Sequence, residues 1–334
     1  MQLDFALATS GFLLAQHFIF PMKHQVLGLH HVTAIAGPAQ RNYDFYTKLL
    51  GLRLLKKTVD FDAPDTYHCY FGDEAGTPGT VLSFFSKPHG ALGRPGTGEA
   101  ATLSYSVPAG SFPFWMERFE EHQVPCHSLS DQFGEPGLAF SDPDGLSLAL
   151  IVGNTPDERR PWITPEMGQA VALRGLHAVQ LTLPRTDDTL GLLTELFGYR
   201  ILQQHGARYR LVTDAVSQAA LLDVVEAPHG RPGIIGIGSV HHVAFRVADE
   251  DVLRHFRERL AARNLPVTPF LDRRYFHSVR FIEPGGLLFE LATDTPGFTI
   301  DEPLAALGTH LQLPAQLESR RAQITALLPT LTTT

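Results

Sequence analysis

Cysteine is nearly absent from this chain, which holds only two among 334 residues. Cys69 and Cys126 lie far apart and form no CxxC pair, so the sequence supports neither a disulfide framework nor a zinc knuckle. A P-loop and a Rossmann glycine fingerprint are also missing at the expected strand-to-helix junctions. Because cysteines are so few, we expect a protein of the reducing cytoplasm. Because both motifs are missing, we do not expect either of these two kinds of nucleotide site.

Positive charge is in deficit as well. Lys and Arg number 27 against 35 Asp and Glu, which gives a formal charge of −8. Nucleic acids and anionic membranes call for a basic face, so neither is expected as a partner. A hydrophobic content of 44% with 19% charged residues is typical of a soluble globular protein, and 334 residues favour two domains. A small organic molecule is the expected partner, and assembly into a homo-oligomer is left open.

The chain also lacks a convincing membrane span or signal peptide. Its N-terminal segment, MQLDFALATSGFLLAQHFIFP, contains an apolar run that is too short and too interrupted by polar residues to span a bilayer. Asp4 comes early, no Lys or Arg precedes the run, and no small-residue cleavage site follows it. We expect residues 1–27 to form a loosely attached extension without a functional role.

Four segments share one order of signals: an alternating strand, an amphipathic helix, then two or three strands. This βαβββ module predicts an α+β fold. The copies open with GLHHVTAIAG, ATLSYSVP, GLHAVQLTLP and SVHHVAFRV. A stretch rich in Pro and charge separates the second copy from the third. The expected division is the extension 1–27, an N-terminal domain of two modules at 28–153, a linker at 154–173, a C-terminal domain of two modules at 174–294, and a C-terminal loop and helix at 295–334.

Aligning the first strand of each copy compares equivalent positions. The second position of the histidine pair holds an imidazole in the first and last copies alone, the four residues being His31, Thr102, Ala178 and His242. The position before it holds His30, Ala101, His177 and His241. Adjacent residues of a regular strand face opposite ways, so only one histidine of each pair can be a ligand. The pattern predicts one metal site, built by the first and fourth modules.

The last strand of each copy adds a carboxylate. Its equivalent position holds Ser83, Ala149, Asp223 and Glu290. Glu290 lies in the apolar strand GLLFELA, where burying an unpaired carboxylate would be costly. Coordination of a divalent cation removes that cost, as would exposure at a sheet edge. Two imidazoles and one carboxylate make the triad of non-haem Fe(II) oxygenases, which leaves positions open for substrate and oxygen.

The repeats resemble the vicinal oxygen chelate superfamily, which includes glyoxalases, bleomycin resistance proteins and extradiol dioxygenases. Within it, the phrases GLHHVTAIAGPAQRNYDFYTKLLGLRLLKKTVDFD, HHVAFRV and PGGLLFELATDTPGF are similar to hydroquinone-type ring-cleaving dioxygenases. The resemblance spans nearly all of residues 28–294 and implies modules paired into two half-open mixed β-barrel domains. It assigns His31, His242 and Glu290 as ligands of Fe(II), although the residue types also suit Mn(II) or Zn(II). It implies an extradiol-type enzyme that cleaves a hydroquinone or catechol ring with O2.

The same resemblance implies an outer layer around the metal. It places His30 and His241 there, where they could hold substrate hydroxyls or move protons, and orientation of neighbouring strands is the alternative role for both. Thr33 shares the face of His31 and matches a pocket residue of these dioxygenases. His68 and Tyr67 could line the cavity, although alternating strand aromatics more often serve packing.

The segment FLDRRYFHSVRF is expected to pass along the pocket and supplies Tyr275 as a further candidate. Arg273 matches an arginine that would stabilise negative charge on a deprotonated diol, and a surface pair with Asp272 is its alternative. Arg280 stands where relatives commonly have a tyrosine, which leaves the substrate class open.

Two other functions use this scaffold. A glyoxalase-type isomerase or lyase uses its metal to acidify a proton beside a carbonyl, usually with an additional Glu ligand. Ser83 holds the position symmetric to Glu290, so we favour the three-ligand oxygenase. A non-catalytic protein that binds an aromatic compound would need no metal ligands at all. His177 and Asp223 are not expected to form a second metal site, because Thr102 and Ala178 hold its ligand positions.

Overall fold

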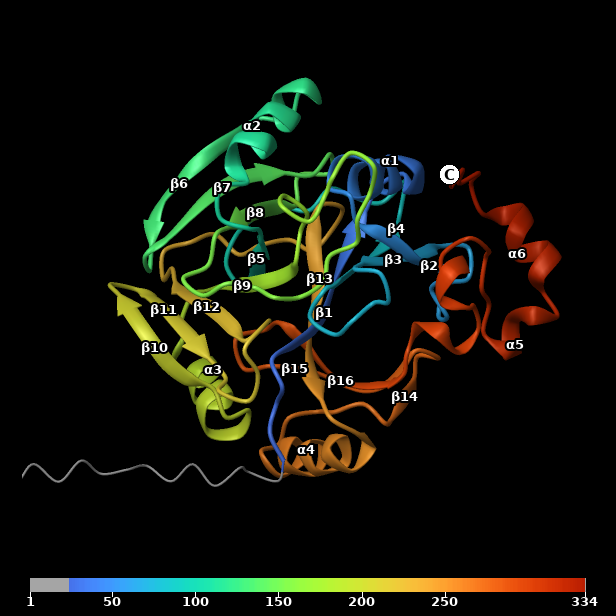
Figure 1. Cartoon of the computed structure of the whole chain (residues 1–334). Coiled ribbons are helices and arrows are strands. Elements are labelled where there is room, and N and C mark those ends of the chain that lie inside the picture. The colour runs from blue at the N-terminus through green and yellow to red at the C-terminus, as the bar shows by residue number, and fades with distance from the viewer. Residues whose placement is uncertain (1–23, 334) are drawn as a thin grey trace, which may run out of the picture.

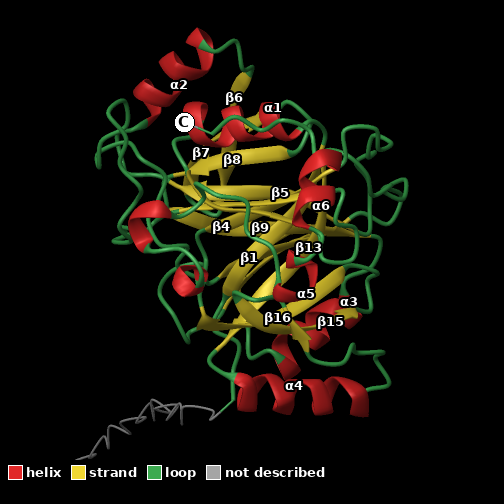
Figure 2. Ribbon diagram, turned by 90° about the vertical axis from the view of Figure 1, so that its right-hand side faces the viewer, coloured by secondary structure: helices red, strands yellow, loops and turns green. Residues whose placement is uncertain are grey.

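The structure is a computed structural model that describes residues 24–333, apart from the side chains of residues 130–132. Most of the predicted N-terminal extension therefore lies outside the described residues. Strands fill the middle of the molecule and the helices lie around them (Figures 1 and 2). No helix in the described part of the chain is long and apolar enough to cross a bilayer.

Each of the four repeats has the predicted βαβββ order. The first module consists of β1 (Leu29–Ala36), α1 (Ala39–Asp44) with a π-helical turn (Phe45–Leu49), β2 (Arg53–Val59), β3 (Tyr67–Gly72) and β4 (Val81–Ser86). The second consists of β5 (Glu99–Ser106), α2 (Phe112–Glu121), β6 (Cys126–Gln132), β7 (Glu135–Ser141) and β8 (Ser147–Ile151).

The other two modules follow the stretch 154–173, which contains neither helix nor strand. The third module consists of β9 (Gly175–Leu183), α3 (Asp187–Gly191) with a π-helical turn (Leu192–Leu196), β10 (Arg200–His205), β11 (Arg208–Val212) and β12 (Leu221–Glu226). The fourth consists of β13 (Ser239–Val247), α4 (Glu250–Ala262), β14 (Leu271–Asp272), β15 (Phe276–Ile282) and β16 (Leu288–Pro296). The chain then forms 3-10 turns at Phe298–Ile300 and Leu304–Ala306, α5 (Ala315–Glu318) and α6 (Arg321–Leu327).

The strands form two mixed sheets. The first sheet has the order β14-β15-β16-β13-β1-β4-β3-β2, and the second has the order β10-β11-β12-β9-β5-β8-β7-β6. The first sheet therefore combines modules one and four, and the second combines modules two and three. The ranges 28–153 and 174–294, predicted as two domains, do not close separate sheets. The first strand of each module lies at the edge of that module. It pairs in antiparallel fashion with the first strand of a module from the other range.

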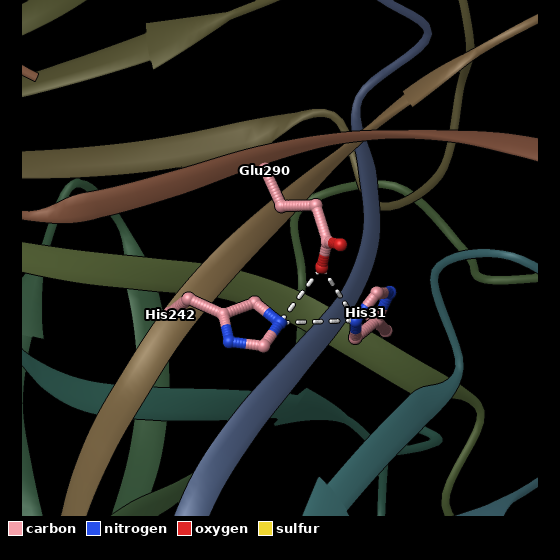
Figure 3. A group of neighbouring side chains, drawn as sticks. All are labelled: His31, His242 and Glu290. Atoms are coloured by element: carbon pink, nitrogen blue, oxygen red, sulfur yellow. Dashed lines mark hydrogen bonds and ion pairs between the residues drawn. The ribbon is translucent and has the colours of Figure 1, made fainter. Parts of the chain in front are cut away.

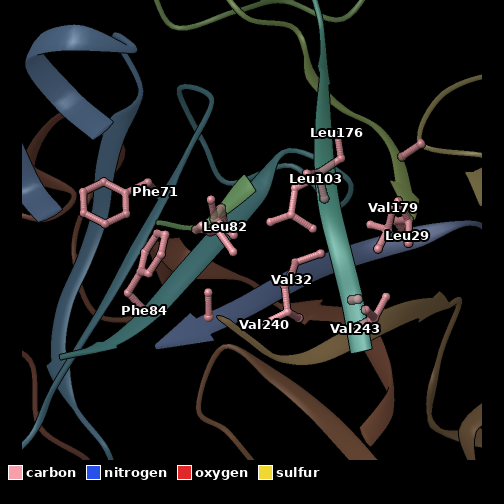
Figure 4. Close-up of a cluster of buried hydrophobic side chains, with 14 of the residues drawn as sticks. Leu29, Val32, Phe71, Leu82, Phe84, Leu103, Leu176, Val179, Val240 and Val243 are labelled. Atoms are coloured by element: carbon pink, nitrogen blue, oxygen red, sulfur yellow. The ribbon is translucent and has the colours of Figure 1, made fainter. Parts of the chain in front are cut away.

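The hydrophobic core joins the two sheets (Figure 4). Val32 of β1, Val243 of β13 and Val179 of β9 all belong to it, and all three are buried. Because side chains alternate along a strand, the neighbours His31 and His242 are left for the opposite face of the first sheet. One face of this sheet thus supports the fold and the other carries polar side chains.

The C-terminal segment is fastened to the first sheet beside β2. Lys56 of β2 is fully buried, and its ammonium group pairs with Glu302 at 2.6 Å and with Asp301. A buried ammonium ion is tolerated only when carboxylates compensate it, so this cluster fixes the segment in place. The C-terminal segment is thus held against the first module, which also carries His31.

Candidate metal centre

Three buried side chains of the first sheet converge on one point (Figure 3). His31 comes from β1, His242 from β13 and Glu290 from β16, which are adjacent strands. Nε2 of His242 lies 2.8 Å from Oε2 of Glu290, and Nε2 of His31 lies 3.4 Å from each of these two atoms. The structure thus brings together the three residues that the repeat alignment selected.

The three ligand atoms fit a shared divalent cation. Oε2 of Glu290 is buried and receives no hydrogen bond, a costly state for a carboxylate oxygen unless a cation compensates it. Ligand atoms about 2.1 Å from one ion stand about 3.0 Å apart at right angles and about 3.4 Å apart at the tetrahedral angle. The two separations of 3.4 Å match the tetrahedral value, and the separation of 2.8 Å lies slightly below the right-angle value. Among the described residues, this is the one group of three such side chains with ligand atoms this close.

Both histidine pairs lie on β-bulges. Where β1 pairs with β13, each strand carries one extra residue, His30 on β1 and His241 on β13. A bulge bends its strand and re-aims the side chain, which is why neighbouring imidazoles stay within hydrogen-bonding distance of one another. Nδ1 of His30 is 2.9 Å from Nδ1 of His31, and the corresponding distance from His241 to His242 is 2.8 Å. The alternation expected of a regular strand therefore fails at these two positions.

The hydrogen bonds of His30 fix the tautomer of its neighbour. Nε2 of His30 lies 3.1 Å from the carbonyl oxygen of Thr293, which can only accept, so Nε2 carries the proton. Burial, aided by His31, lowers the pKa of His30 to about 3, so the ring is neutral and its Nδ1 accepts from Nδ1–H of His31. Nε2 of His31 keeps its lone pair for a metal.

His30 and His241 differ in the number of ring nitrogens that are free of hydrogen bonds. Both ring nitrogens of His30 are engaged, by His31 and Thr293. His241 uses Nδ1 for His242, and among the described residues no hydrogen-bond partner takes its Nε2. Burial, then Arg280, lowers the pKa of His241 to about 4. Of the pair, His241 is the one with a ring nitrogen available to a substrate.

Arg280 lies against the triad itself. Its Nε donates to Oε1 of Glu290 at 3.1 Å, and the two residues are paired across β15 and β16. Burial alone would raise the pKa of Glu290, but Arg280 and then His242 outweigh it and hold that pKa well below its usual range. Arg280 therefore keeps Glu290 anionic, as a metal ligand must be.

The other residues of the β14–β15 region have different surroundings. Nη1 of Arg273 lies 3.8 Å from Oδ2 of Asp62, so Arg273 pairs with Asp62 and not with Asp272. The Nε of Arg273 is buried and has no partner among the described residues. The hydroxyl of Tyr275 donates to Asp301 at 3.1 Å, and its ring stacks on Phe298. The C-terminal segment thus engages the hydroxyl of Tyr275, and the catalytic role of this residue stays a prediction.

A chain of hydrogen bonds runs from the ligand strand to β3. Oγ1 of Thr33 lies 2.8 Å from Oγ of Ser83, which lies 3.0 Å from Nε2 of His68. Nδ1 of His68 in turn lies 3.1 Å from the hydroxyl of Tyr70. Sequence reasoning missed Ser83 and Tyr70 as members of this chain and favoured packing for His68. The period-two spacing of His68 and Tyr70 was the available signal, since it places both on one face of β3.

The sequence profile of the Glyoxalase/Bleomycin resistance protein/Dioxygenase superfamily matches residues 28–150 and 175–299. The chain belongs to this superfamily. Each match covers two modules, and the predicted linker lies between the matches. The resemblance noted in the sequence and the predicted fold class are both confirmed.

Similar proteins within this superfamily cover nearly the whole chain. A Bacillus subtilis protein named as a ring-cleaving dioxygenase, MhqE, is 44% identical over 306 residues, covering 91% of this chain and 99% of the relative. The chlorohydroquinone/hydroquinone 1,2-dioxygenase of Sphingobium indicum is 35% identical over 311 residues, covering 91% and 96%. A crystal structure described as a dioxygenase of Bacillus subtilis superposes with a TM-score of 0.88 at 38% identity, covering 92% and 98%. Glyoxalase I of Zea mays shares the fold alone, with a TM-score of 0.60 at 15% identity, covering 86% and 97%.

Proposed function

We propose that this protein is an Fe(II)-dependent dioxygenase that opens the ring of a hydroquinone or catechol, with both atoms of O2 entering the product. The observation that carries the proposal is the buried triad of His31, His242 and Glu290, whose ligand atoms are spaced for one ion. Such a triad binds the metal from one side and leaves positions for a diol and for oxygen. The names of MhqE and of the Sphingobium indicum relative agree with this chemistry.

The position symmetric to Glu290 favours an oxygenase over a glyoxalase-type enzyme. Ser83 is paired with Thr33 across β1 and β4, and its hydroxyl is engaged by Thr33 and His68. A serine held in this way does not replace the additional carboxylate ligand of a glyoxalase-type site. The described residues therefore offer three protein ligands.

The residues around the triad have separable tasks in this reaction. Bound Fe(II) would supply the Lewis-acid and redox chemistry that joins oxygen to the ring. Nε2 of His241 is available to hold a substrate hydroxyl or to move its proton. Arg273, with its unpartnered Nε, supplies positive charge to a deprotonated diol. Arg280 acts on Glu290, so its charge tunes a ligand.

Oxygen uptake by the iron-loaded protein tests the proposal. The protein is reconstituted with Fe(II) under anaerobic conditions and then mixed with oxygenated hydroquinone or catechol. We expect one O2 consumed per ring opened, and loss of uptake in His31→Ala, His242→Ala and Glu290→Ala. His177→Ala is the matched control, because His177 occupies the equivalent bulge of the second sheet.

Two outcomes would overturn the proposal. Isomerisation of a hemithioacetal supported by Zn(II), with no oxygen uptake on either diol, would establish a glyoxalase-type enzyme. Tight binding of the diols that persists in all three ligand variants, without turnover, would establish a binding protein.

A further inference from the structure

The second sheet repeats the metal-binding cup with different side chains. In the first sheet, His31 and Glu290 both pair with Ala244. In the second sheet, Thr102 and Asp223 both pair with Gln180. Each carboxylate also faces an arginine on the next strand, Arg280 opposite Glu290 and Arg210 opposite Asp223. The second cup therefore keeps the arginine–carboxylate pair and replaces the histidine ligands.

Small residues in the second cup leave a cavity of about 620 Å³. Ala139 and Ala149 line it at the positions that Tyr70 and Ser83 hold in the first sheet, as the strand registers show. Thr102 lines it at the position of His31. Ligand pockets for small organic molecules are about 300–1,000 Å³. The exchange of large side chains for small ones thus provides room for one such molecule.

One cation in this cavity lacks a carboxylate partner. Arg210 is bound by Asp223 through two hydrogen bonds of 2.7 and 2.8 Å, and also by Glu135. Arg208, two residues away on β11, donates through Nη1 to the neutral amide oxygen of Gln180 at 2.7 Å. No other hydrogen bond of its guanidinium group is formed within the described residues. Arg208 therefore offers charged donors to a ligand.

The remaining acid of the cavity is satisfied by its own surroundings. Asp142 accepts the hydroxyl of Tyr46 at 3.1 Å and the backbone N–H groups of Asp144 and Leu146. The carboxylate of Asp142 therefore uses its hydrogen-bonding capacity on these three donors. An anion entering the cavity consequently meets Arg208 as its free charged partner and the hydroxyls of Thr102 and Ser147 as neutral ones.

We propose that the second cup binds a small organic carboxylate, with the guanidinium group of Arg208 as its main contact. A guanidinium group presents paired donors that match the two oxygens of a carboxylate. The alanines of the cavity, together with Leu129 and Ile151, provide apolar surface for the carbon skeleton, which an inorganic anion would leave unused. This site is separate from the triad, since it lies on the other sheet.

Calorimetric titration of the metal-loaded full chain tests this site, with benzoate and hexanoate as the carboxylate probes. Arg208→Gln is expected to weaken binding by about 10-fold or more, the value of a charge-assisted hydrogen bond. Arg200→Gln is the matched control, because Arg200 lies on the neighbouring strand β10 and pairs with Asp214 at the surface. Ala139→Leu fills the cavity without changing charge and should also abolish binding. His242→Ala should leave binding unchanged, which separates this site from the metal centre.

The probes distinguish the kinds of carboxylate. Binding of benzoate alone would identify an aromatic acid as the ligand, and binding of both probes would include aliphatic acids. The proposal fails if neither probe binds, or if benzyl alcohol or sulfate binds as tightly as benzoate. It also fails if Arg208→Gln and Ala139→Leu, shown to be folded by circular dichroism, bind as the unchanged protein does.

Discussion

Replacing His30 tests whether the bulge histidine sets the metal affinity of the site. In His30→Phe, Nδ1–H of His31 loses its acceptor and the carbonyl of Thr293 loses its donor. The ring of His31 is then free to turn or to exchange tautomers, and a fraction of the molecules no longer presents Nε2 to the metal. Loss of such an outer hydrogen bond costs about 10- to 100-fold in metal affinity. We expect this range, about 1.4 to 2.7 kcal/mol.

The affinity is measured by competition with a chromophoric chelator, under anaerobic conditions for Fe(II) and in parallel for Zn(II). His177→Phe is the control because His177 also lies on a bulge, the one in the second sheet that is equivalent to the bulge at His241, and its Nε2 bonds to Glu135. It should change stability without changing metal affinity. His30→Asn should restore part of the affinity, since its amide oxygen can accept from Nδ1–H of His31.

A His30→Phe protein that binds metal within two-fold of the original would refute this reasoning. It would show that packing alone orients His31. Equal weakening in His177→Phe would refute it in another way, by showing that the loss comes from general destabilisation.

Three further perturbations have outcomes that follow from the structure. Glu290→Gln should abolish stoichiometric iron binding, measured by metal analysis after gel filtration, and retained iron would contradict the triad. Lys56→Met should lower the free energy of unfolding by about 3–5 kcal/mol in urea, because it leaves Asp301 and Glu302 buried with less compensation; a loss below 1 kcal/mol would contradict this. Burial raises the pKa of Asp142 from 3.8 to about 6. Ionisation of Asp142 therefore lowers the stability of the folded chain as pH rises from about 4 to about 6. Between pH 4 and pH 7, the free energy of unfolding of Asp142→Asn should rise by up to about 3 kcal/mol relative to that of the original chain, measured in paired urea titrations. If the two free energies keep the same difference over this pH range, the raised pKa of Asp142 is refuted.

The sequence predicted the modules because their signals are local. Strand alternation and helix periodicity repeat in each copy, so the βαβββ order could be read four times. The repeat alignment also brought modules one and four together, because the predicted metal ligands come from both. The strand pairing itself could not be predicted, because all four first strands are apolar and alternating. The structure pairs β1 with β13 and β5 with β9.

The site was predictable where equivalent positions differ between copies. His31, His242 and Glu290 stood out because Thr102 and Ala178 occupy two of the same positions elsewhere. The hydrogen bond from Tyr275 to Asp301 could not be predicted, since Asp301 lies in a segment without a repeat to compare. The bulges could not be predicted either, because an extra residue in one strand is recognised only from its pairing register with the neighbouring strand.

The two cups together show which parts of the metal centre belong to the scaffold. Both sheets have a bulge at equivalent positions, at His241 in one and at His177 in the other. Among its described residues, the second sheet has no group of three side chains that could share a metal ion. The arginine–carboxylate pair also occurs in both. These features therefore do not depend on a metal. What distinguishes the metal cup is the pair of imidazoles at positions 31 and 242, delivered by two strands that the fold already holds side by side. Placing histidines at Thr102 and Ala178, with Asp223 left in place, should consequently create weak metal binding in the second sheet, and Arg210→Leu should strengthen it by freeing that carboxylate.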